Sequence, residues 1–302
     1  MRQGIMLCYP WSESRLLTYK APYIVEPKLN GDRCRAIIKP GYVELLSSQC
    51  NRINMLPELE EQLHSLMLKL VEVGRLKDGD KLMLDGELYN HDLSHQDIHG
   101  IVARRVNPSL DSFLIRFYVF DAIINDNKDT PQVYRTDFLH DFLYKEYLSK
   151  YHNIKVVNSL RCDNVKEVKQ QIEQFVKQGY EGAVIKNPYA TYVEKRSTNW
   201  MKIKPRKFDT YKVVGYKEAV DKYGVPKGEL GAFIVADQDG KEFSVGSGFT
   251  QDEREKWWLY KDAMIGMDII VAYPELTKRG IPSHPVFKGQ WLGGERCGVL
   301  DI

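Results

Sequence analysis

Hydrophobic residues in the first two hundred positions recur at two spacings, and the wider spacing predicts helices. In residues 57–74 leucines return every three or four positions behind a proline, the pattern of an amphipathic helix that begins at that proline. Residues 163–179 repeat the pattern between an Asp-Asn cap and a closing glycine. Ser94 is expected to cap a short helix, and residues 131–151 are also helical in pattern. The leucine stripe of the first helix consists of Leu59, Leu63, Leu66 and Leu70.

Short alternating or apolar runs between these helices predict strands. Residues 23–28 and 33–39 are two such runs, and Asn30-Gly31 between them predicts a tight hairpin turn because both residues tolerate positive φ. Residues 81–90 predict a strand that runs into a turn at Asp85-Gly86. Further strands are predicted within residues 113–124, 181–188 and 199–205.

The pattern changes after Lys207. Four or five strands are predicted within residues 211–275, and one helix over residues 250–266 interrupts them, with Thr250 and Glu253 as its capping box. A short barrel with one helix between its third and fourth strands is the OB arrangement, a common oligonucleotide binder. The sequence therefore predicts an α+β chain with two domains, residues 1–206 and residues 207–302.

Composition agrees with a two-domain globular protein. The 302 residues are enough for two domains, and no apolar run reaches the length of a membrane span. The first residues lack the apolar stretch of a secretory signal. Five cysteines without any CxxC pair argue against a disulfide framework or a zinc site. We therefore expect reduced thiols and a cytoplasmic location, with no membrane partner.

Charge is balanced overall but clustered in one tract. The net charge is +2, whereas residues 186–207 hold seven Lys or Arg against one acid. Such a tract attracts polyanions, but a solvated basic surface has the same composition. Charge alone therefore leaves both interpretations open.

The stretch EPKLNGDRC, residues 26–34, contains the first candidate for chemistry. Lys28 is expected at a strand end beside a turn, a rigid position that can face a cleft. A lysine is a nucleophile only when its amine is neutral, which burial or nearby cations favour. Glu26 and Asp32 oppose this unless their charge is offset. An ordinary solvent-exposed lysine is the alternative.

Four further motifs carry groups that suit a nucleotide or a phosphate. Glu87 in DGE can accept a ribose hydroxyl or help to hold a metal, or is simply an exposed turn acid. Phe120 can stack on a purine or belong to the core. Glu181 and Lys186 in EGAVIK reach one site only if the strand twists or bulges. Lys202 and Lys204, two apart on a predicted strand, face the same side, which favours an anionic ligand between them.

The order and spacing of these motifs are more specific than any one of them. K-x-N-G-x-R, then DGE, an aromatic strand, EGAVIK, and KIKP before an OB-like segment closely resemble the covalent nucleotidyltransferases. Within that superfamily the chain is similar to the ATP-dependent DNA ligases, especially the compact phage-type ones, over roughly residues 20–291. The stretches LSHQDIHGIVARR and HPVFKGQW also resemble segments of those enzymes.

This resemblance implies a fold, a reaction and roles for single residues. The fold would be an ATP-grasp-like nucleotidyltransferase domain of antiparallel sheets with flanking helices, followed by an OB-fold β-barrel. Lys28 would attack the α-phosphate of ATP, AMP would pass from lysyl-AMP to the 5′-phosphate of a DNA nick, and the 3′-hydroxyl would then seal the strand. The implied nucleotide contacts are Glu26 at adenine, Arg33 at the sugar or phosphate, Glu87 at ribose, Phe120 on the base, and Lys186, Lys202 and Lys204 at the α-phosphate. Glu181 would assist a divalent metal.

The resemblance also implies partners and shows departures. ATP, Mg²⁺ and nicked duplex DNA are the expected partners of a monomer that acts in replication, repair and recombination. Only 27 residues precede Lys28, which favours ATP over NAD. Asn30 stands where the family usually has Asp, and Ser47-Ser48 stands where it often has Ser-Arg, with Arg52 as a candidate replacement. An Arg-and-Lys motif that some relatives carry at the end of the OB domain is not evident.

Two other interpretations remain open at this point. An RNA ligase or an mRNA-capping guanylyltransferase would use the same lysine chemistry. A catalytically inactive nucleic-acid-binding relative would keep the fold without the reaction, and Asn30 makes it conceivable.

Overall fold

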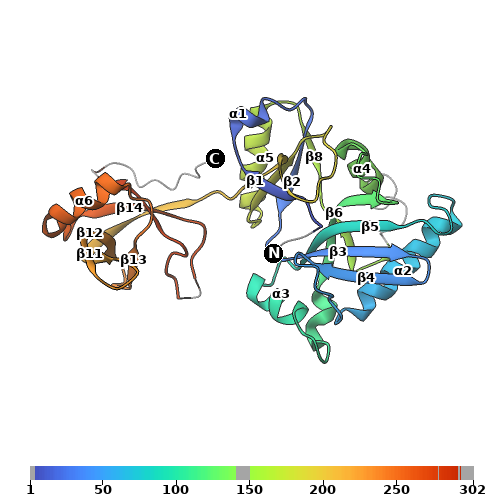
Figure 1. The fold of residues 1–302 in the computed structure, drawn as a ribbon, viewed down its shortest axis with the longest axis horizontal. Helices are drawn as coiled ribbons and strands as arrows, with labels where there is room; N and C mark the ends of the chain where they lie inside the picture. The colour runs from blue at the N-terminus through green and yellow to red at the C-terminus, as the bar shows by residue number, and fades with distance from the viewer. Residues whose placement is uncertain (1–3, 141–149, 278, 292, 294–302) are drawn as a thin grey trace. The chain divides into compact units, whose positions relative to one another are not determined.

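The computed structural model describes residues 4–140, 150–277, 279–291 and 293, and the chain divides into two compact units. The first unit is Met1–Ile203 and the second is Lys204–Ile302 (Figure 1). Within the described residues, no helix is both long enough and apolar enough to span a membrane.

One five-stranded sheet of the first unit has the order β4-β3-β5-β6-β7 and packs against helix α2. Its pairs are antiparallel except for β6 with β7. The predicted helix is α2, Pro57–Glu72, and the four leucines of its stripe are buried, as their spacing predicted. The strands are β3 (Asp32–Lys39), β4 (Tyr42–Ser47), β5 (Leu82–Tyr89), β6 (Arg116–Ile124) and β7 (Ile154–Val156).

The other sheet of the first unit has the order β1-β10-β9-β2-β8 and packs against helix α5. Helix α5, Val165–Lys177, begins at its cap Asn164 and buries Val168, Ile172 and Phe175 (Figure 1). Its strands are β1 (Leu7–Pro10), β2 (Tyr23–Lys28), β8 (Leu160–Cys162), β9 (Gly182–Lys186) and β10 (Arg196–Ile203).

Short helices connect these strands. Ser94 caps α3, His95–Val102, as predicted, by accepting a hydrogen bond from the backbone of Asp97. The predicted helix over residues 131–151 begins as α4, Gln132–Asp137, but residues 141–149 lie outside the described residues, as does Cys297. Two more short helices among the described residues are α1 (Glu13–Leu16) and the 3-10 helix η1 (Leu110–Leu114).

The predicted hairpin at Asn30-Gly31 is wrong. Strands β2 and β3 do not pair with each other, because the chain crosses here from one sheet to the other. Neither Asn30 nor Gly31 has a positive φ. Glycine is needed at position 31 for a different reason: a Cβ there would lie 2.2 Å from the carbonyl oxygen of Leu88.

The predicted turn at Asp85-Gly86 is also wrong, because β5 continues through both residues to Tyr89. The pairing with β6 shifts register between Asp85 and Gly86, which marks a bulge. A Cβ at Gly86 would lie 2.4 Å from the carbonyl oxygen of Tyr118, so glycine again permits a close approach of two backbones. Asp85 is therefore completely buried instead of exposed on a turn.

The second unit has one five-stranded antiparallel sheet in the order β13-β12-β11-β14-β15. Helix α6, Gln251–Leu259, lies between β13 and β14 in the chain and has the predicted capping box of Thr250 and Glu253, and the 3-10 helix η4 (Lys261–Met264) follows it. Phe233, Val271 and Phe287 lie in its core. The strands are β11 (Lys207–Val220), β12 (Pro226–Ala236), β13 (Glu242–Val245), β14 (Asp268–Tyr273) and β15 (Val286–Gln290).

The predicted OB-fold barrel is partly open. Strand ladders among the described residues do not close, and a single parallel bridge between Ser247 and Val286 links the two edges of the sheet. The helix position and this strand order are those of an OB fold, which is a partly open barrel. The fold is thus mixed α+β with antiparallel sheets, as predicted.

Candidate active site

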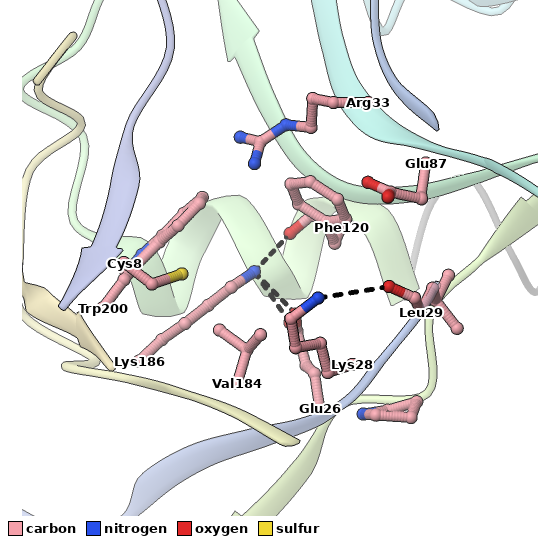
Figure 2. A pocket seen from close by; sticks show the side chains of 11 residues that line it. Cys8, Glu26, Lys28, Leu29, Arg33, Glu87, Phe120, Val184, Lys186 and Trp200 are labelled. Atoms are coloured by element: carbon pink, nitrogen blue, oxygen red, sulfur yellow. Dashed lines mark hydrogen bonds and ion pairs between the residues drawn. The ribbon is translucent and has the colours of Figure 1, made fainter. Parts of the chain in front are cut away.

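A cavity within the first unit collects side chains from both of its sheets (Figure 2). On β2, Glu26 and Lys28 share one face because they are two residues apart. Val184 lies opposite Glu26 on β9, and Lys186 on the same strand lies opposite Trp200 on β10. The cavity is lined by Cys8, Glu26, Pro27, Lys28, Leu29, Arg33, Glu87, Phe120, Val184, Lys186 and Trp200, and we call it the lysine cavity.

Lys28 is the last residue of β2, and its side chain is 20 % exposed. Its amine donates a hydrogen bond to the carboxylate of Glu181 and a long one, 3.4 Å, to the carbonyl oxygen of Leu29. The backbone N–H of Glu181 donates in turn to the carbonyl oxygen of Lys28, at 3.2 Å. The ammonium is therefore charge-paired and held at the cavity wall.

Glu181 lies just before strand β9, and its carboxylate accepts a hydrogen bond from the Lys28 amine. Strand β9 begins at Gly182, whose φ of +149° few other residues adopt, so strand alternation does not fix the side of Glu181. Lys186 and Val184 follow the alternation and line the cavity. Glu181 and Lys186, the two ends of EGAVIK, thus both lie near Lys28. The positive φ of Gly182 at the start of the strand permits this arrangement.

A second ion pair, Lys186 with Glu26, lies at the base of the cavity. Both side chains are buried, at 1 % and 3 % exposure, and their charged atoms are 2.8 Å apart. The Lys186 amine also donates to the carbonyl oxygen of Phe120 at 2.6 Å, and Ser159 donates to Glu26 at 2.7 Å. Burial raises the pKa of Glu26, and the adjacent Lys186 charge opposes that rise.

Arg33 is fixed by a fork of two hydrogen bonds to Asp85. Its Nε and Nη2 atoms lie 2.7 and 2.6 Å from the two carboxylate oxygens, and Tyr192 donates to the same carboxylate at 2.6 Å. The guanidinium stacks on the Phe120 ring, 4.5 Å from its centroid. Asp85 and Tyr192 were not predicted as site residues: Asp85 belongs to DGE, but the Asp-Gly pair indicates a turn.

Glu87 faces the cavity from β5. Burial raises its pKa to about 7, while Lys28 and Arg33 act in the opposite direction. A carboxyl group with this pKa exchanges its proton near neutral pH. It can therefore accept a hydrogen bond from a hydroxyl at alkaline pH and donate one at acidic pH.

Two aromatic residues of the cavity, Phe120 and Trp200, lie against the Lys186 amine. The ring of Phe120 meets that of Trp200 edge to face with centroids 6.0 Å apart, and the Lys186 amine lies 4.6 Å from the Trp200 ring (Figure 2). Phe120 is therefore a cavity residue as well as a core contact. Cys8 and Trp200 also line the cavity but were not predicted, because neither stands in a motif that suggests chemistry.

The two remaining lysines of the predicted site differ in position. Lys202 lies within β10 opposite Val184, whereas Lys204 follows the last residue of that strand and belongs to the second unit. Strand alternation therefore determines which face of the sheet Lys202 occupies, but it does not apply to Lys204, which lies outside the strand. Lys202 is not among the residues that line the lysine cavity.

Comparisons with known proteins match both units to one kind of enzyme. Residues 6–204 match the family model of the ATP dependent DNA ligase domain, and residues 223–290 match that of the DNA ligase OB-like domain. The DNA ligase of African swine fever virus (strain Badajoz 1971 Vero-adapted) is 30 % identical over 275 residues, 86 % of this chain. The match spans 61 % of that viral protein's length.

Solved structures agree on the fold. The structure named Pmar-Lig_Pre has a TM-score of 0.72 at 24 % identity, over 95 % of this chain and 67 % of its own. The ATP-dependent DNA ligase of bacteriophage T7 in complex with ATP has a TM-score of 0.58 at 19 % identity, over 95 % of this chain and 98 % of its own.

Proposed function

Because this chain belongs to the ATP-dependent DNA ligase family, we propose that it seals nicks between a 5′-phosphate and a 3′-hydroxyl in duplex DNA. The reaction has three phosphoryl-transfer steps, and the first takes place at Lys28. The single observation that carries the proposal is the position of Lys28: a hydrogen-bonded amine at the end of β2, in a cavity between two sheets.

In the first step the Lys28 amine attacks the α-phosphorus of ATP. An N–P bond forms, the bond to the leaving pyrophosphate breaks, and the amine loses a proton. The Glu181 carboxylate is the acceptor already hydrogen-bonded to that amine. Phosphoryl transfer depends on positioning and charge neutralisation, and Arg33 and Lys186, which both line the cavity, would supply them.

The same cavity suits the rest of the nucleotide. Glu26 and the carbonyl group of Phe120 are acceptors for an exocyclic amino group, and both already accept from Lys186. The ring of Phe120 offers a face on which the base can stack. The carboxylate of Glu87 can accept a hydrogen bond from a ribose hydroxyl. We propose that Lys202 and Lys204 contact the α-phosphate.

Mg²⁺ is proposed as the metal of the reaction. The described residues contain no cluster of three or more His, Cys, Asp or Glu side chains suited to a metal. Mg²⁺ normally needs only one or two carboxylates in addition to substrate phosphates and water, so the acids beside Lys28 fit it. Glu181, with Glu87 as a second candidate, would hold the ion, whose charge would neutralise the phosphate oxygens.

The later steps use DNA. AMP passes from Lys28 to the 5′-phosphate, and the 3′-hydroxyl then displaces AMP. We propose that residues 1–206 carry the adenylation chemistry and that residues 207–302 bind the duplex, as OB folds bind oligonucleotides. The basic tract over residues 186–207 would add electrostatic attraction. We further propose that the enzyme is a cytoplasmic monomer.

A nick-sealing assay tests this function. The protein should join a labelled nicked duplex with ATP and Mg²⁺ but not with GTP, and it should leave a nicked RNA duplex open. Lys28→Ala should abolish joining. Lys39 is an exposed lysine at the end of β3, and the Lys39→Ala variant should still join the nick. Joining of RNA alone would support an RNA ligase, use of GTP a capping-type enzyme, and no joining by the wild type an inactive relative.

A further inference from the structure

A buried arginine of the first unit lacks the carboxylate partner that a buried cation normally has. Arg35 lies on β3 and is 6 % exposed, and its Nη1 atom donates to the carbonyl oxygen of Gly4 at 2.6 Å. Its Nε atom is buried without a hydrogen-bond partner, and no described carboxylate lies within ion-pair distance of its guanidinium. Asp85 lies opposite Arg35 on β5, but its two carboxylate oxygens accept from Arg33 and Tyr192.

Two other cationic side chains are buried among the described residues, and each is paired. Arg135 lies 2.7 Å from a carboxylate oxygen and Lys186 lies 2.8 Å from another. A buried charge without such a partner is strongly destabilising. The Nη2 atom of Arg35 lies 3.0 Å from the sulfur of Cys50. Of the two groups that accept from Arg35, only this thiol can carry the missing negative charge.

Cys50 is held beside the guanidinium and is open to solvent. The residue is exposed and lies in the turn after β4 with a φ of +62°. Its backbone N–H donates to the carbonyl oxygen of Ser47 at 3.0 Å, and the N–H of Ser47 donates to the carbonyl oxygen of Asn51 at 2.8 Å. These bonds close the turn, so Cys50 combines a fixed position, a cationic neighbour and access for small molecules.

The other described cysteines lack this combination. Cys34 and Cys162 are buried, and burial raises the pKa of both thiols. Cys8 lies in the lysine cavity, and burial raises the pKa of its thiol although several cations oppose that rise. The thiolate is the reactive form of cysteine, so these three thiols should react slowly.

We propose that Cys50 is a redox modification site, at which a hydroperoxide oxidises a thiolate that Arg35 stabilises. The thiolate attacks one oxygen of hydrogen peroxide, an S–O bond forms and the O–O bond breaks. The sulfur is oxidised to sulfenic acid, while the hydroxide that leaves takes a proton from solvent and becomes water. The site does not depend on the proposed ligase function, because Cys50 and Arg35 lie outside the lysine cavity.

Chemical labelling of the full chain tests this assignment. The protein is exposed to hydrogen peroxide, sulfenic acid is trapped with dimedone, and peptide mass spectrometry gives a labelling rate for each cysteine. Arg35→Gln removes the guanidinium charge but keeps a hydrogen-bond donor. The matched control, Cys50→Ser/Ser65→Cys, moves the exposed thiol to Ser65, which is exposed on α2.

We expect Cys50 of the wild type to be labelled about tenfold or more faster than Cys8 and than the thiol at position 65, because the guanidinium favours the thiolate. Arg35→Gln should slow the labelling of Cys50 by about tenfold for the same reason. Arg35→Lys should be intermediate, since it keeps the charge but loses the fork of donors.

Three results would overturn the proposal. Equal rates for Cys50 and for the thiol at position 65 would make exposure the whole cause of reactivity. An unchanged rate in Arg35→Gln would show that the arginine merely donates to a neutral thiol. Faster labelling of Cys8 than of Cys50 would move the reactive thiol to the lysine cavity. If Arg35→Gln fails to fold, as judged by its thermal melting, the comparison with position 65 still decides.

Discussion

Two cavities of the first unit adjoin Arg33, and their charged groups differ. One is the lysine cavity; the other, which we call the arginine cavity, is lined at the start of β3, in the loop after β4 and at the end of α3, and its arginines are Arg33, Arg52, Arg104 and Arg105. In the lysine cavity Lys28 is paired with Glu181, and Lys186 with the buried Glu26. Arg33 itself is paired with the buried Asp85. In the arginine cavity the exposed Arg52, Arg104 and Arg105 form no ion pair among the described residues, although the charge of Arg52 acts against the burial-raised pKa of Glu60.

Burial explains this difference. A cation taken out of water is strongly destabilising unless a carboxylate accompanies it, so the lysine cavity must hold its charges in pairs before any nucleotide arrives. Exposed arginines remain hydrated and need no carboxylate partner, so their charge stays available to bind a polyanion. The two cavities therefore suit two kinds of ligand. The lysine cavity suits a small ligand whose groups replace the carboxylates that now pair with its cations. The arginine cavity suits a polymer whose phosphates replace the water around its arginines.

The largest effect is expected from breaking a buried pair. Lys186→Met leaves the Glu26 carboxylate buried without its partner, which should lower the free energy of unfolding by about 3–5 kcal/mol. The matched control is Lys128→Met, whose pair with Glu194 is exposed and should be worth about 0–1 kcal/mol. Denaturant titration measures both, and Glu26→Gln/Lys186→Met should recover much of the loss. Equal losses in the two single variants would remove the distinction between buried and exposed charge.

An intermediate effect is expected from Glu87, and it depends on pH. Its pKa rises from 4.5 in the unfolded chain to about 7 in the folded protein, so the folded state binds more protons between these values. The free energy of unfolding should therefore fall by about 3 kcal/mol as pH rises through that window, and Glu87→Gln should remove most of this pH dependence. Unfolding curves of both proteins at about pH 5 and about pH 8 provide the test. A wild type and a variant with parallel pH profiles would contradict the assignment.

The smallest effect on stability is expected in the arginine cavity. Arg104→Ala/Arg105→Ala should change the free energy of unfolding by less than about 0.5 kcal/mol, because these side chains are exposed and have no partner to lose. The same variant should reduce the salt dependence of DNA binding, with the slope of log K against log salt shallower by about 0.9 for each DNA phosphate that the variant no longer neutralises. A large loss of stability with an unchanged salt slope would show that these arginines are structural.

Much of the fold was predictable from local patterns. The leucine stripe of α2, the caps of α3 and α5 and the capping box of α6 each depend on residues within a few positions of one another. What local patterns could not reveal is which sheet a strand joins. Asn30-Gly31 has the composition of a hairpin turn, but the chain there crosses between sheets, and glycine is required by the close approach of the distant Leu88.

The candidate site was predictable where a motif marks it. Lys28, Glu26, Arg33, Glu87, Phe120 and Lys186 all line the lysine cavity, as motif order suggested, although their roles stay a prediction. Asp85 and Tyr192, which fix Arg33, were missed because Asp-Gly normally indicates a turn and a lone tyrosine carries no pattern. The arginine cavity had no sequence signal as a unit, because its segments lie far apart along the chain.

The central claim is that the amine of Lys28 becomes bonded to AMP. Incubation with α-labelled ATP and Mg²⁺, followed by proteolysis and mass spectrometry, locates the adduct directly. We predict one acid-labile, base-stable AMP on the peptide that contains Lys28, and none in Lys28→Ala. A label on another lysine, or equal labelling of the Lys28→Ala variant, would contradict the account.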